Sequence, residues 1–357
     1  MVEPAMGALA GLKVIDMASL YAAPLAATIM ADFGADVLKI EPPEGDQFRG
    51  SKMWPLIARG KRCLALDLRS PDGIEALKAL IAQADVVVEN YPAGVLVKRG
   101  IGWDVLSAIN SRLVMLSVSC FGATGPYSDR PGSGTIGEGF GGLTWLMGEE
   151  DGPPMLPSVA LGDAVGAMSA VIGTLTALYW RERSGCGQKI DASLFEPILQ
   201  IVAHAAQRWT PGHAPERCGS RLPGVLRNVY RTADMRFVAI SASTVRHQAD
   251  LVALVEGEGD EDARVADWVA GISQADVVAT LVTRRIPVTP VNSMDALLAD
   301  PHVRERGSLI HVESDALGDL ALAAPTPRLS ATPGRMGDVN PVLGRDLAEM
   351  LALWQRA

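Results

Sequence analysis

Short apolar runs alternate with longer segments of helical periodicity through the first third of the chain. Leu12–Asp16 is a short apolar run, and Ala23–Phe33 repeats its apolar residues at helical spacing before Gly34. The run Asp36–Glu41 then has the composition of a second strand. Together these residues predict a β-α-β unit.

The same alternation continues to residue 120. It predicts further strands and helices, namely strands at Cys63–Leu68, Asp85–Asn90 and Leu113–Cys120, and helices at Ser70–Gln83 and Trp103–Asn110. Ser70 and Pro71 are typical of the N-cap and the first position of a helix. Alternation of this kind predicts a parallel sheet covered by helices, with ligands bound at the carboxyl ends of its strands.

Residues 121–158 interrupt the alternation because they are rich in Gly and Pro. A segment of this length is too long for a simple connection, so we predict an active-site segment. Two long helices are expected next, at Asp163–Arg183 and Leu194–Trp209. The uncharged run Ala164–Trp180 has seventeen residues and many small side chains. A membrane span needs roughly 20 residues, so this run predicts a buried helix.

The second half of the chain has a different pattern. Short strands at Arg236–Ser241 and Ile286–Val291 alternate with a helix at Val265–Thr283, and prolines precede a final helix at Arg345–Arg356. We therefore predict an α/β protein with two domains. Its parts are a large domain that begins with residues 1–209, a linker at 210–227, a small α/β domain at 228–325, and a return segment at 326–357 that completes the large domain.

Composition limits the possible partners. The 357 residues carry a formal net charge of −9, which argues against nucleic acid or an anionic membrane, since both are bound by clustered Lys and Arg. A small anionic ligand in a locally basic pocket remains open. The four cysteines form no Cys-x-x-Cys pair, and the N-terminus lacks a basic signal-peptide region. We therefore expect reduced thiols and a cytoplasmic protein.

Several common catalytic motifs are absent. The chain has no His-Glu-x-x-His, no Walker A loop and no Gly-x-Ser-x-Gly, and its five histidines are far apart, so a metal site is not expected. Gly132, Gly134 and Gly137 match Gly-x-Gly-x-x-Gly, but they begin twelve residues after Cys120. A dinucleotide-binding loop leaves its strand directly. A flexible active-site loop is therefore the favoured interpretation.

Asp163 lies at the predicted start of the long helix. An Asp there commonly acts as an N-cap that satisfies free backbone amides. The positive end of the helix dipole also keeps a carboxylate ionised, as a nucleophile requires. The pattern alone leaves both roles open. The pairs Lys39 with Glu41 and Lys98 with Arg99 are equally open between solvated surface charge and contacts to phosphates.

A family resemblance extends over nearly the whole chain. It is carried, in order, by Gly11–Asp16, Ala35–Glu41, Val88–Asn90, Gly122–Arg130, Gly162–Asp163, Gly185–Asp191, Ala299–Pro301, Thr332–Gly334 and Leu343–Gly344. Together these segments resemble the class III (CaiB/BaiF-type) coenzyme A transferases. The resemblance implies a split Rossmann-like large domain that contains both chain ends, a smaller α/β domain, and an interlocked homodimer.

The resemblance also implies a chemistry. In this family the aspartate at the position of Asp163 attacks an acyl-CoA, and an aspartyl-CoA thioester then passes CoA to a carboxylic acid. Acyl-CoA and small carboxylic acids are the expected substrates, with no metal and no permanently bound cofactor. Glu138 lies where relatives carry an acid or amide near the nucleophile. The residues that the resemblance places along CoA are Tyr21, Ala22, Leu66, Arg69, Asn90, Tyr91, Pro92, Lys98 and Arg99.

Two departures from the family pattern narrow the activity. Racemases of the 2-methylacyl-CoA type carry a His after the equivalent of Pro131, where this chain has Gly132–Gly134. The alternative activity is that of a racemase or isomerase, and this chain would lack one of the two acid/base groups that it needs. The glycine-rich lid of formyl-CoA transferases is also missing near Gly219–Arg227. The run beginning at Arg227 is more similar to succinyl-CoA-dependent transferases, and Arg227 is a candidate to pair with a second carboxylate, although a surface role is equally open.

Overall fold

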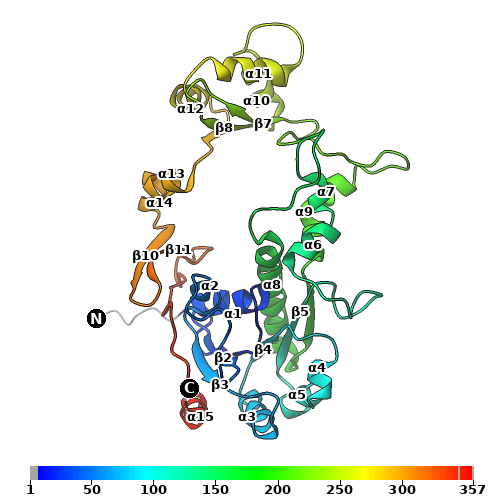
Figure 1. Cartoon of the computed structure of the whole chain (residues 1–357), viewed down its shortest axis with the longest axis vertical. Helices are drawn as coiled ribbons and strands as arrows, with labels where there is room; N and C mark the ends of the chain where they lie inside the picture. The colour runs from blue at the N-terminus through cyan, green and yellow to red at the C-terminus, as the bar shows by residue number, and fades with distance from the viewer. Residues whose placement is uncertain (1–6, 345, 356–357) are drawn as a thin grey trace. The chain divides into compact units, whose positions relative to one another are not determined.

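The structure is a computed structural model that describes residues 7–344 and 346–355 (Figure 1). The chain divides into two compact units. Unit 1 contains Met1–Thr144, Leu156–Arg208 and Ser308–Ala357, and unit 2 contains Trp145–Met155 and Trp209–Gly307. The first and last parts of the chain thus belong to one unit, while the domain limits expected from the sequence stay a prediction.

Unit 1 is built on a six-stranded parallel sheet with the strand order β3-β2-β1-β4-β5-β6. The strands are β1 (Lys13–Asp16), β2 (Asp36–Glu41), β3 (Arg62–Ala65), β4 (Val86–Glu89), β5 (Val114–Ser119) and β6 (Lys189–Ser193). The inner strands are apolar along most of their length because helices cover both faces. The strand order reverses between β1 and β4, and ligands of such sheets bind beyond the carboxyl ends of the strands at that point.

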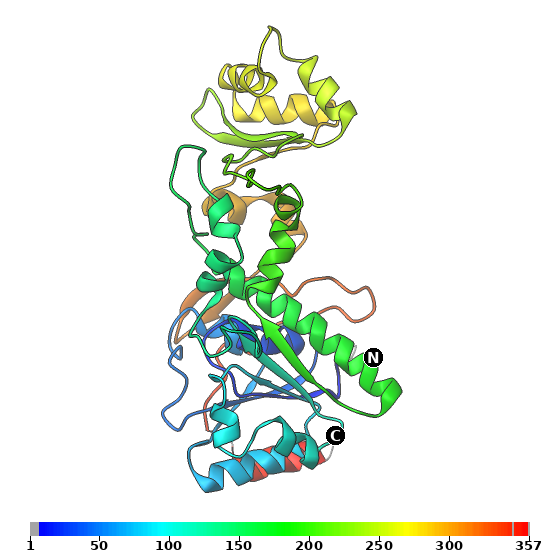
Figure 2. The same cartoon turned by 90° about the vertical axis from the view of Figure 1, so that its right-hand side faces the viewer.

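Helices cover both faces of the sheet. The helices from residue 22 to residue 206, together with the last one, are α1 (Ala22–Asp32), α2 (Trp54–Ala58), α3 (Pro71–Ile81), α4 (Val95–Lys98), α5 (Trp103–Ile109), α6 (Gly134–Phe140), α7 (Leu143–Leu146), α8 (Leu161–Ser184), α9 (Glu196–Ala206) and α15 (Leu347–Gln355). The limit between the two units falls within α7. One core lies between the sheet and helices α1 and α8, and another lies between the sheet and helices α3, α5 and α15. Figure 2 shows α15, in red, beside the helices of this second layer.

Unit 2 has its own smaller sheet. Its antiparallel strands are β7 (Leu226–Arg231), β8 (Phe237–Ala242) and β9 (Val288–Pro290). Helices α10 (Val245–Val252), α11 (Glu261–Ala270) and α12 (Gln274–Thr283) form a core with it, and α13 (Met294–Ala299) and α14 (Pro301–Glu305) follow. The hairpin β10 (Leu309–Ser314) and β11 (Gly318–Ala323) belongs to unit 1. The prediction of an α/β fold with a parallel sheet is confirmed.

The predicted elements before residue 121 are all present, each within three residues of its predicted limits. Ser70 caps α3, since its Oγ accepts a hydrogen bond from Gly73 N at 3.0 Å. The single helix predicted at Val265–Thr283 is wrong. Gly271 ends α11 there, and the Ser273 hydroxyl caps α12. The final helix is α15, and the predicted ends Arg345 and Arg356 lie outside the described residues.

Helix α8 differs from the expected buried helix. It has 24 residues, and among the described residues it is the one helix long and apolar enough to cross a membrane by length and composition. Small side chains such as Ala167 and Ala170 bury one face against the core of unit 1. The opposite face exposes large apolar side chains, which we call the α8 stripe: Met168, Ile172, Leu175, Tyr179 and Trp180. The prediction of burial therefore holds for one face only.

Candidate active site

Asp163 lies in the first turn of α8. The N-cap of this helix is Ala160, so Asp163 is not the N-cap. Its carboxylate faces the first residue of α6, Gly134. Burial raises the pKa of Asp163, the N–H of Gly134 lowers it, and the nearby Glu138 charge raises it again. The net effect is a raised pKa. This is expected for a carboxylate that is partly removed from water and accepts a hydrogen bond from one backbone donor.

Glu138 ties the two helices together. Its side chain is buried in α6, and its Oε1 accepts a hydrogen bond from Gly162 N at 2.7 Å. Gly162 immediately precedes Asp163. Glu138 therefore satisfies one of the free backbone donors at the start of α8 and places a second carboxylate beside the first.

The three glycines of the Gly-x-Gly-x-x-Gly match are required by close packing. A Cβ on Gly134 would lie 2.3 Å from Oδ2 of Asp163, and a Cβ on Gly132 would lie 2.3 Å from Cβ of Cys120. Gly137 packs against the backbone of Leu194, with 3.2 Å between an added Cβ and its carbonyl carbon. Gly134 therefore allows α6 to approach α8, while Gly132 and Gly137 allow this segment to pass close to Cys120 and Leu194. The sequence interpretation of a flexible loop is wrong for Gly134–Phe140, which forms α6.

Tyr21 and Ala22 lie at the start of α1, where Tyr21 is the N-cap residue. Burial raises the pKa of the Tyr21 hydroxyl, and the negative charge of Asp163 raises it further, while Arg59 lowers it. Helix α1 packs against α8, and this places the Tyr21 hydroxyl within electrostatic range of Asp163. The structure thus brings Glu138 against the start of α8 beside Asp163, with Tyr21 in the same region.

A cavity of about 270 Å³ lies beyond the carboxyl ends of β1, β2, β3 and β4, and we call it the strand-end cavity. Four of the residues predicted to bind CoA line it: Leu66, Arg69, Tyr91 and Arg99. The Arg99 guanidinium lies over the Tyr91 ring, 5.1 Å from its centroid. A cation held on an aromatic face at strand ends suits a ligand that carries phosphates and an aromatic base.

The other predicted residues occupy different places. Asn90 lies behind the strand-end cavity, where its Oδ1 accepts from Ser19 N at 2.9 Å and its Nδ2 donates to Ser19 O at 2.7 Å. Lys98 is exposed at the end of α4 and lines none of the described cavities. Pro92 lines a different cavity. Asn90 therefore supports a neighbouring loop, whereas Lys98 faces solvent.

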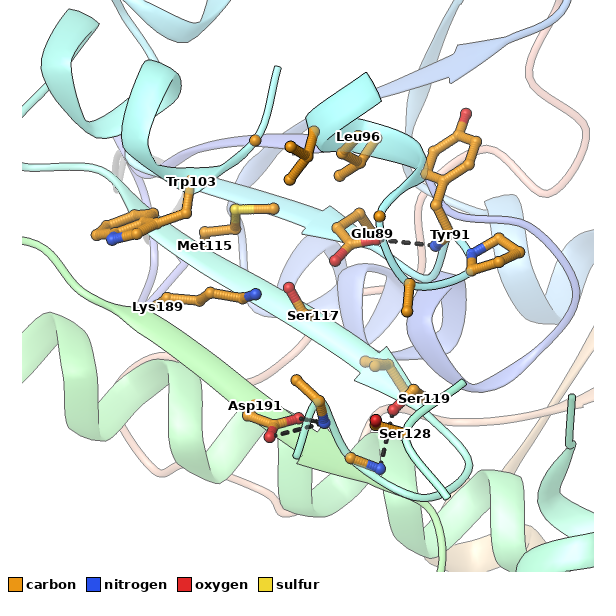
Figure 3. Close-up of a pocket in the computed structure, with 18 residues that line it drawn as sticks. Glu89, Tyr91, Leu96, Trp103, Met115, Ser117, Ser119, Ser128, Lys189 and Asp191 are labelled. Atoms are coloured by element: carbon orange, nitrogen blue, oxygen red, sulfur yellow. Dashed lines mark hydrogen bonds between the residues drawn. The ribbon is translucent and has the colours of Figure 1, made fainter. Parts of the chain in front are cut away.

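This second cavity, of about 110 Å³, lies at the ends of β4, β5 and β6 (Figure 3). Glu89 is buried in its wall and accepts a hydrogen bond from Tyr91 N at 2.8 Å. Burial raises the pKa of Glu89, and Ser117, the Tyr91 N–H and the Lys189 charge lower it. Figure 3 shows the Lys189 side chain pointing toward Ser117 and Glu89. Tyr91 lines both cavities and separates them.

Neither sequence interpretation of Lys39 and Glu41 is correct. Lys39 is fully buried, and its ammonium lies 3.2 Å from Asp46 and 3.8 Å from Asp16. Glu41 forms a buried ion pair with Arg49 at 2.6 Å. Lys39 is therefore available neither to solvent nor to phosphates, whereas Glu41 and Asp46 are paired carboxylates in the wall of the strand-end cavity.

Unit 2 contains a separate cavity of about 340 Å³, lined by Arg221, Arg227, Asp262 and several apolar side chains. Arg221 is paired with Glu150 at 2.5 Å. Arg227 lines the cavity wall, as a contact to a carboxylate would require, so its suggested role stays a prediction. Within residues 7–344 and 346–355, no group of three or more His, Cys, Asp and Glu side chains is close enough to hold a metal ion.

Comparisons of sequence and of fold agree on the family of this protein. The model of CoA-transferase family III matches residues 9–347, and the chain belongs to this family. A solved CAIB/BAIF family protein from Brucella suis superimposes with a TM-score of 0.84 at 29% identity, covering 98% of this chain and 100% of that chain. The protein is a CoA transferase.

Its curated relatives are transferases with small dicarboxylic substrates in their names. The succinyl-CoA–D-citramalate CoA-transferase of Chloroflexus aurantiacus is 34% identical over 95% of this chain and 92% of the relative. The succinyl-CoA–L-malate CoA-transferase beta subunit of that organism is 36% identical over 96% of this chain and 93% of the relative. The succinate–glutarate CoA-transferase of Agrobacterium fabrum is 30% identical, over 96% and 95%. Such relatives use CoA thioesters and small carboxylic acids.

Proposed function

We propose that this protein moves CoA from succinyl-CoA to a small dicarboxylic acid through an aspartyl-CoA thioester at Asp163. The observation that carries the proposal is the environment of the Asp163 carboxylate, which lies at the start of α8 between the Gly134 N–H, Glu138 and Tyr21. The dicarboxylic acids named for the relatives support the substrate class.

The reaction proceeds as a series of acyl exchanges, first at the carbonyl carbon of the donor thioester and then at the carbonyl carbon of Asp163. A carboxylate oxygen of Asp163 attacks the thioester carbonyl, the C–S bond breaks, and CoA leaves as the thiolate. The thiolate then attacks the aspartyl carbonyl of the mixed anhydride, and the donor leaves as a carboxylate. The acceptor carboxylate reverses both steps and leaves as its CoA thioester. Each step replaces one activated acyl group by another, so no ATP is consumed.

The surroundings of Asp163 suit these steps. Its raised pKa reflects a carboxylate that has lost part of its hydration, which makes it a stronger nucleophile. The Gly134 N–H is placed to stabilise the negative charge that forms on the aspartyl carbonyl oxygen when the thiolate or the acceptor carboxylate attacks the aspartyl carbonyl carbon. Partial burial also protects the anhydride from water, which would otherwise hydrolyse it.

The strand-end cavity supports a role in holding the CoA nucleotide. Arg69 and Arg99 supply two cations at its wall, although Arg69 is already paired with Asp67 at 2.8 Å. Arg99, which lies over Tyr91, is the better candidate for a phosphate contact. Ser19, in the loop between β1 and α1, lines the same cavity two residues before Tyr21. The pantetheine arm would follow this loop toward Asp163.

A second copy of the chain is the proposed partner of the α8 stripe. Five large apolar side chains on one helix face are more than a monomeric protein usually exposes in one place. Met168, Ile172, Leu175 and Tyr179 are spaced by three and four residues and share one helix face, and Trp180 widens this face. A homodimer, with interlocked subunits as in the family, would cover it.

The experiment that tests the function is mass spectrometry of the protein after incubation with succinyl-CoA, with hydroxylamine or borohydride used to trap the adduct. We expect CoA bound to Asp163 with release of succinate, and no adduct in the matched variants Asp163→Asn and Asp163→Ala. Transfer at the wild-type rate in either variant would overturn the proposal. Deuterium exchange at the acyl α-carbon without an adduct would identify a racemase.

A further inference from the structure

A buried lysine lies beneath the loop that joins β1 to α1. The Lys61 side chain is fully buried, and its ammonium donates three hydrogen bonds: to Asp16 Oδ2 at 2.7 Å, to Pro24 O at 2.7 Å and to Ile57 O at 2.6 Å. All three ammonium hydrogens are thus used. The acceptors come from β1, α1 and α2, so one charged group connects three elements around the start of α1.

Residues 17–21, which we call the β1–α1 loop, are held by related contacts. Asp16 Oδ1 accepts from Ala18 N at 3.1 Å, and the buried Lys39 ammonium donates to Ala18 O at 2.9 Å. On the other side, the Asn90 amide bonds both the N–H and the C=O of Ser19. The loop is therefore fixed at successive residues by side chains from β1, β2 and the end of β4.

The fixed loop contains a strained residue. Leu20 has a φ of 66°, in the left-handed region that a leucine rarely adopts. Such a conformation persists only where the surroundings determine it, and it is common at functional sites. The next residue is Tyr21, and the negative charge of Asp163 raises the pKa of its hydroxyl. The position of Tyr21 against the nucleophile therefore depends on the contacts that hold this loop.

We propose that Lys61 is a positioning residue for CoA transfer, and that its ammonium, acting through Asp16 and the start of α1, holds the β1–α1 loop and Tyr21 against Asp163. The inference rests on the proposed function of Asp163. Lys61 touches no substrate. Without its charge, Asp16 would keep only Lys39, at 3.8 Å, as a cationic partner. The carbonyl oxygens of Pro24 and Ile57 would each lose the bond from Lys61, and Pro24 O would keep the bond from the Thr28 hydroxyl at 3.0 Å.

The charges around Lys61 set the pH at which its ammonium loses its proton, so its role can be measured in the pH dependence of the turnover rate. The groups that face it are Asp16 on β1, Asp32 on α1 with its partner Arg59, Lys39 on β2 and Cys63 on β3. Burial lowers the pKa of Lys61 to about 8, against the attraction of Asp16. The pKa of Asp16 is lowered, and those of Lys39 and Cys63 are raised. Lys61 is thus the member of this cluster that loses its charge near pH 8.

Activity and stability should respond to this titration in opposite directions. The turnover rate falls as the pH rises through about 8, because neutral Lys61 no longer holds Asp16. The pKa of an unfolded lysine is higher, 10.5, so between these two values the unfolded state binds more protons. The contribution of Lys61 to stability therefore increases with pH over the same range. A fall in rate there is not the result of unfolding.

The test compares two variants with a control in one pH series, using succinyl-CoA and a dicarboxylic acid. Lys61→Met should lower kcat by about 10²-fold, as expected for a displacement of roughly 1 Å, and abolish the fall near pH 8. Asp16→Asn removes the charge that raises the Lys61 pKa, so the fall should move to lower pH. The control is Arg181→Met, which breaks an ion pair at the amino end of β4, to Asp85 at 2.8 Å, and should leave the profile unchanged.

The outcomes separate this inference from the proposed function. A wild-type profile in Asp16→Asn, or wild-type kcat in Lys61→Met, would overturn the role of Lys61 while adduct formation at Asp163 continued. Absence of the Asp163 adduct in the wild-type protein would instead overturn the function. If Lys61→Met fails to fold, judged by thermal unfolding, the shift in Asp16→Asn still decides the question.

Discussion

At the scale of single residues, the site depends on two close contacts between a carboxylate and the backbone of a glycine. Gly134 and Asp163 are in direct contact because one lacks a side chain, and Glu138 reaches Gly162 because α6 crosses the start of α8. The Asp163 carboxylate therefore keeps one fixed donor and one fixed negative neighbour. Each of these contacts predicts a measurable effect.

Gly134→Ala should lower kcat by about 10²-fold, because the added Cβ would lie 2.3 Å from Asp163 Oδ2 and 2.5 Å from its backbone N. Either the carboxylate or α6 must move. The matched control is Gly139→Ala in the same helix, where an added Cβ meets no atom within 4 Å. Steady-state kinetics of both variants, with thermal unfolding to confirm the fold, checks this prediction. Equal activity in the two variants would show that the contact is unimportant.

The acidic limb of the pH profile reports the ionisation of Asp163. The nucleophile is the carboxylate, so kcat/KM falls as the pH decreases through its pKa, which lies above the usual 3.8 because of burial and Glu138. Glu138→Gln removes the negative neighbour while its amide oxygen still accepts from Gly162 N. The limb should therefore shift to lower pH in this variant. An unchanged limb would mean that the Glu138 charge does not act on Asp163.

At the scale of elements, five of the six parallel strands and helices α1 and α8 were predictable, whereas helix α6 was not. Strands covered on both faces, such as β4 and β5, are largely apolar, which the sequence displays directly. The edge strand β6 was missed because its exposed and less exposed residues alternate over only five positions. Helix α6 contains three glycines, which have low helix propensity. Two of them allow close packing, Gly134 against Asp163 and Gly137 against Leu194. Only the family resemblance pointed to Glu138.

The cavity at the strand ends predicts different roles for two adjacent cations. Arg99 lines the strand-end cavity over Tyr91, whereas Lys98 is exposed outside it. Arg99→Met should raise KM for the acyl-CoA by about tenfold with little change in kcat, since a phosphate contact acts equally on substrate and transition state. Lys98→Met serves as the control and should change KM less. A larger effect at Lys98 would place the phosphates on the other side of α4.

At the scale of the whole molecule, the ends of the chain meet in one unit. Met350 and Trp354 of α15 are buried in the core beside β1 and β2, and the Trp354 indole N–H donates to Asp36 at 2.9 Å. Prolines in the sequence suggested that the tail returns to the large domain, and the family resemblance implied the same. Contacts over more than 300 residues leave no local pattern, so helical periodicity does not show which core α15 joins.

The α8 stripe predicts that the protein forms a homodimer. Ile172 belongs to this stripe and is 67% exposed. Ile172→Glu should prevent dimer formation, because the dimer would bury an unpaired charge. Val245→Glu is the control, since this residue is 86% exposed on α10 of unit 2. Sedimentation equilibrium measures both. Interlocked subunits would also exchange slowly between isotopically labelled and unlabelled dimers in the absence of denaturant. Rapid exchange would exclude interlocking, and a wild-type monomer at every concentration would exclude the dimer.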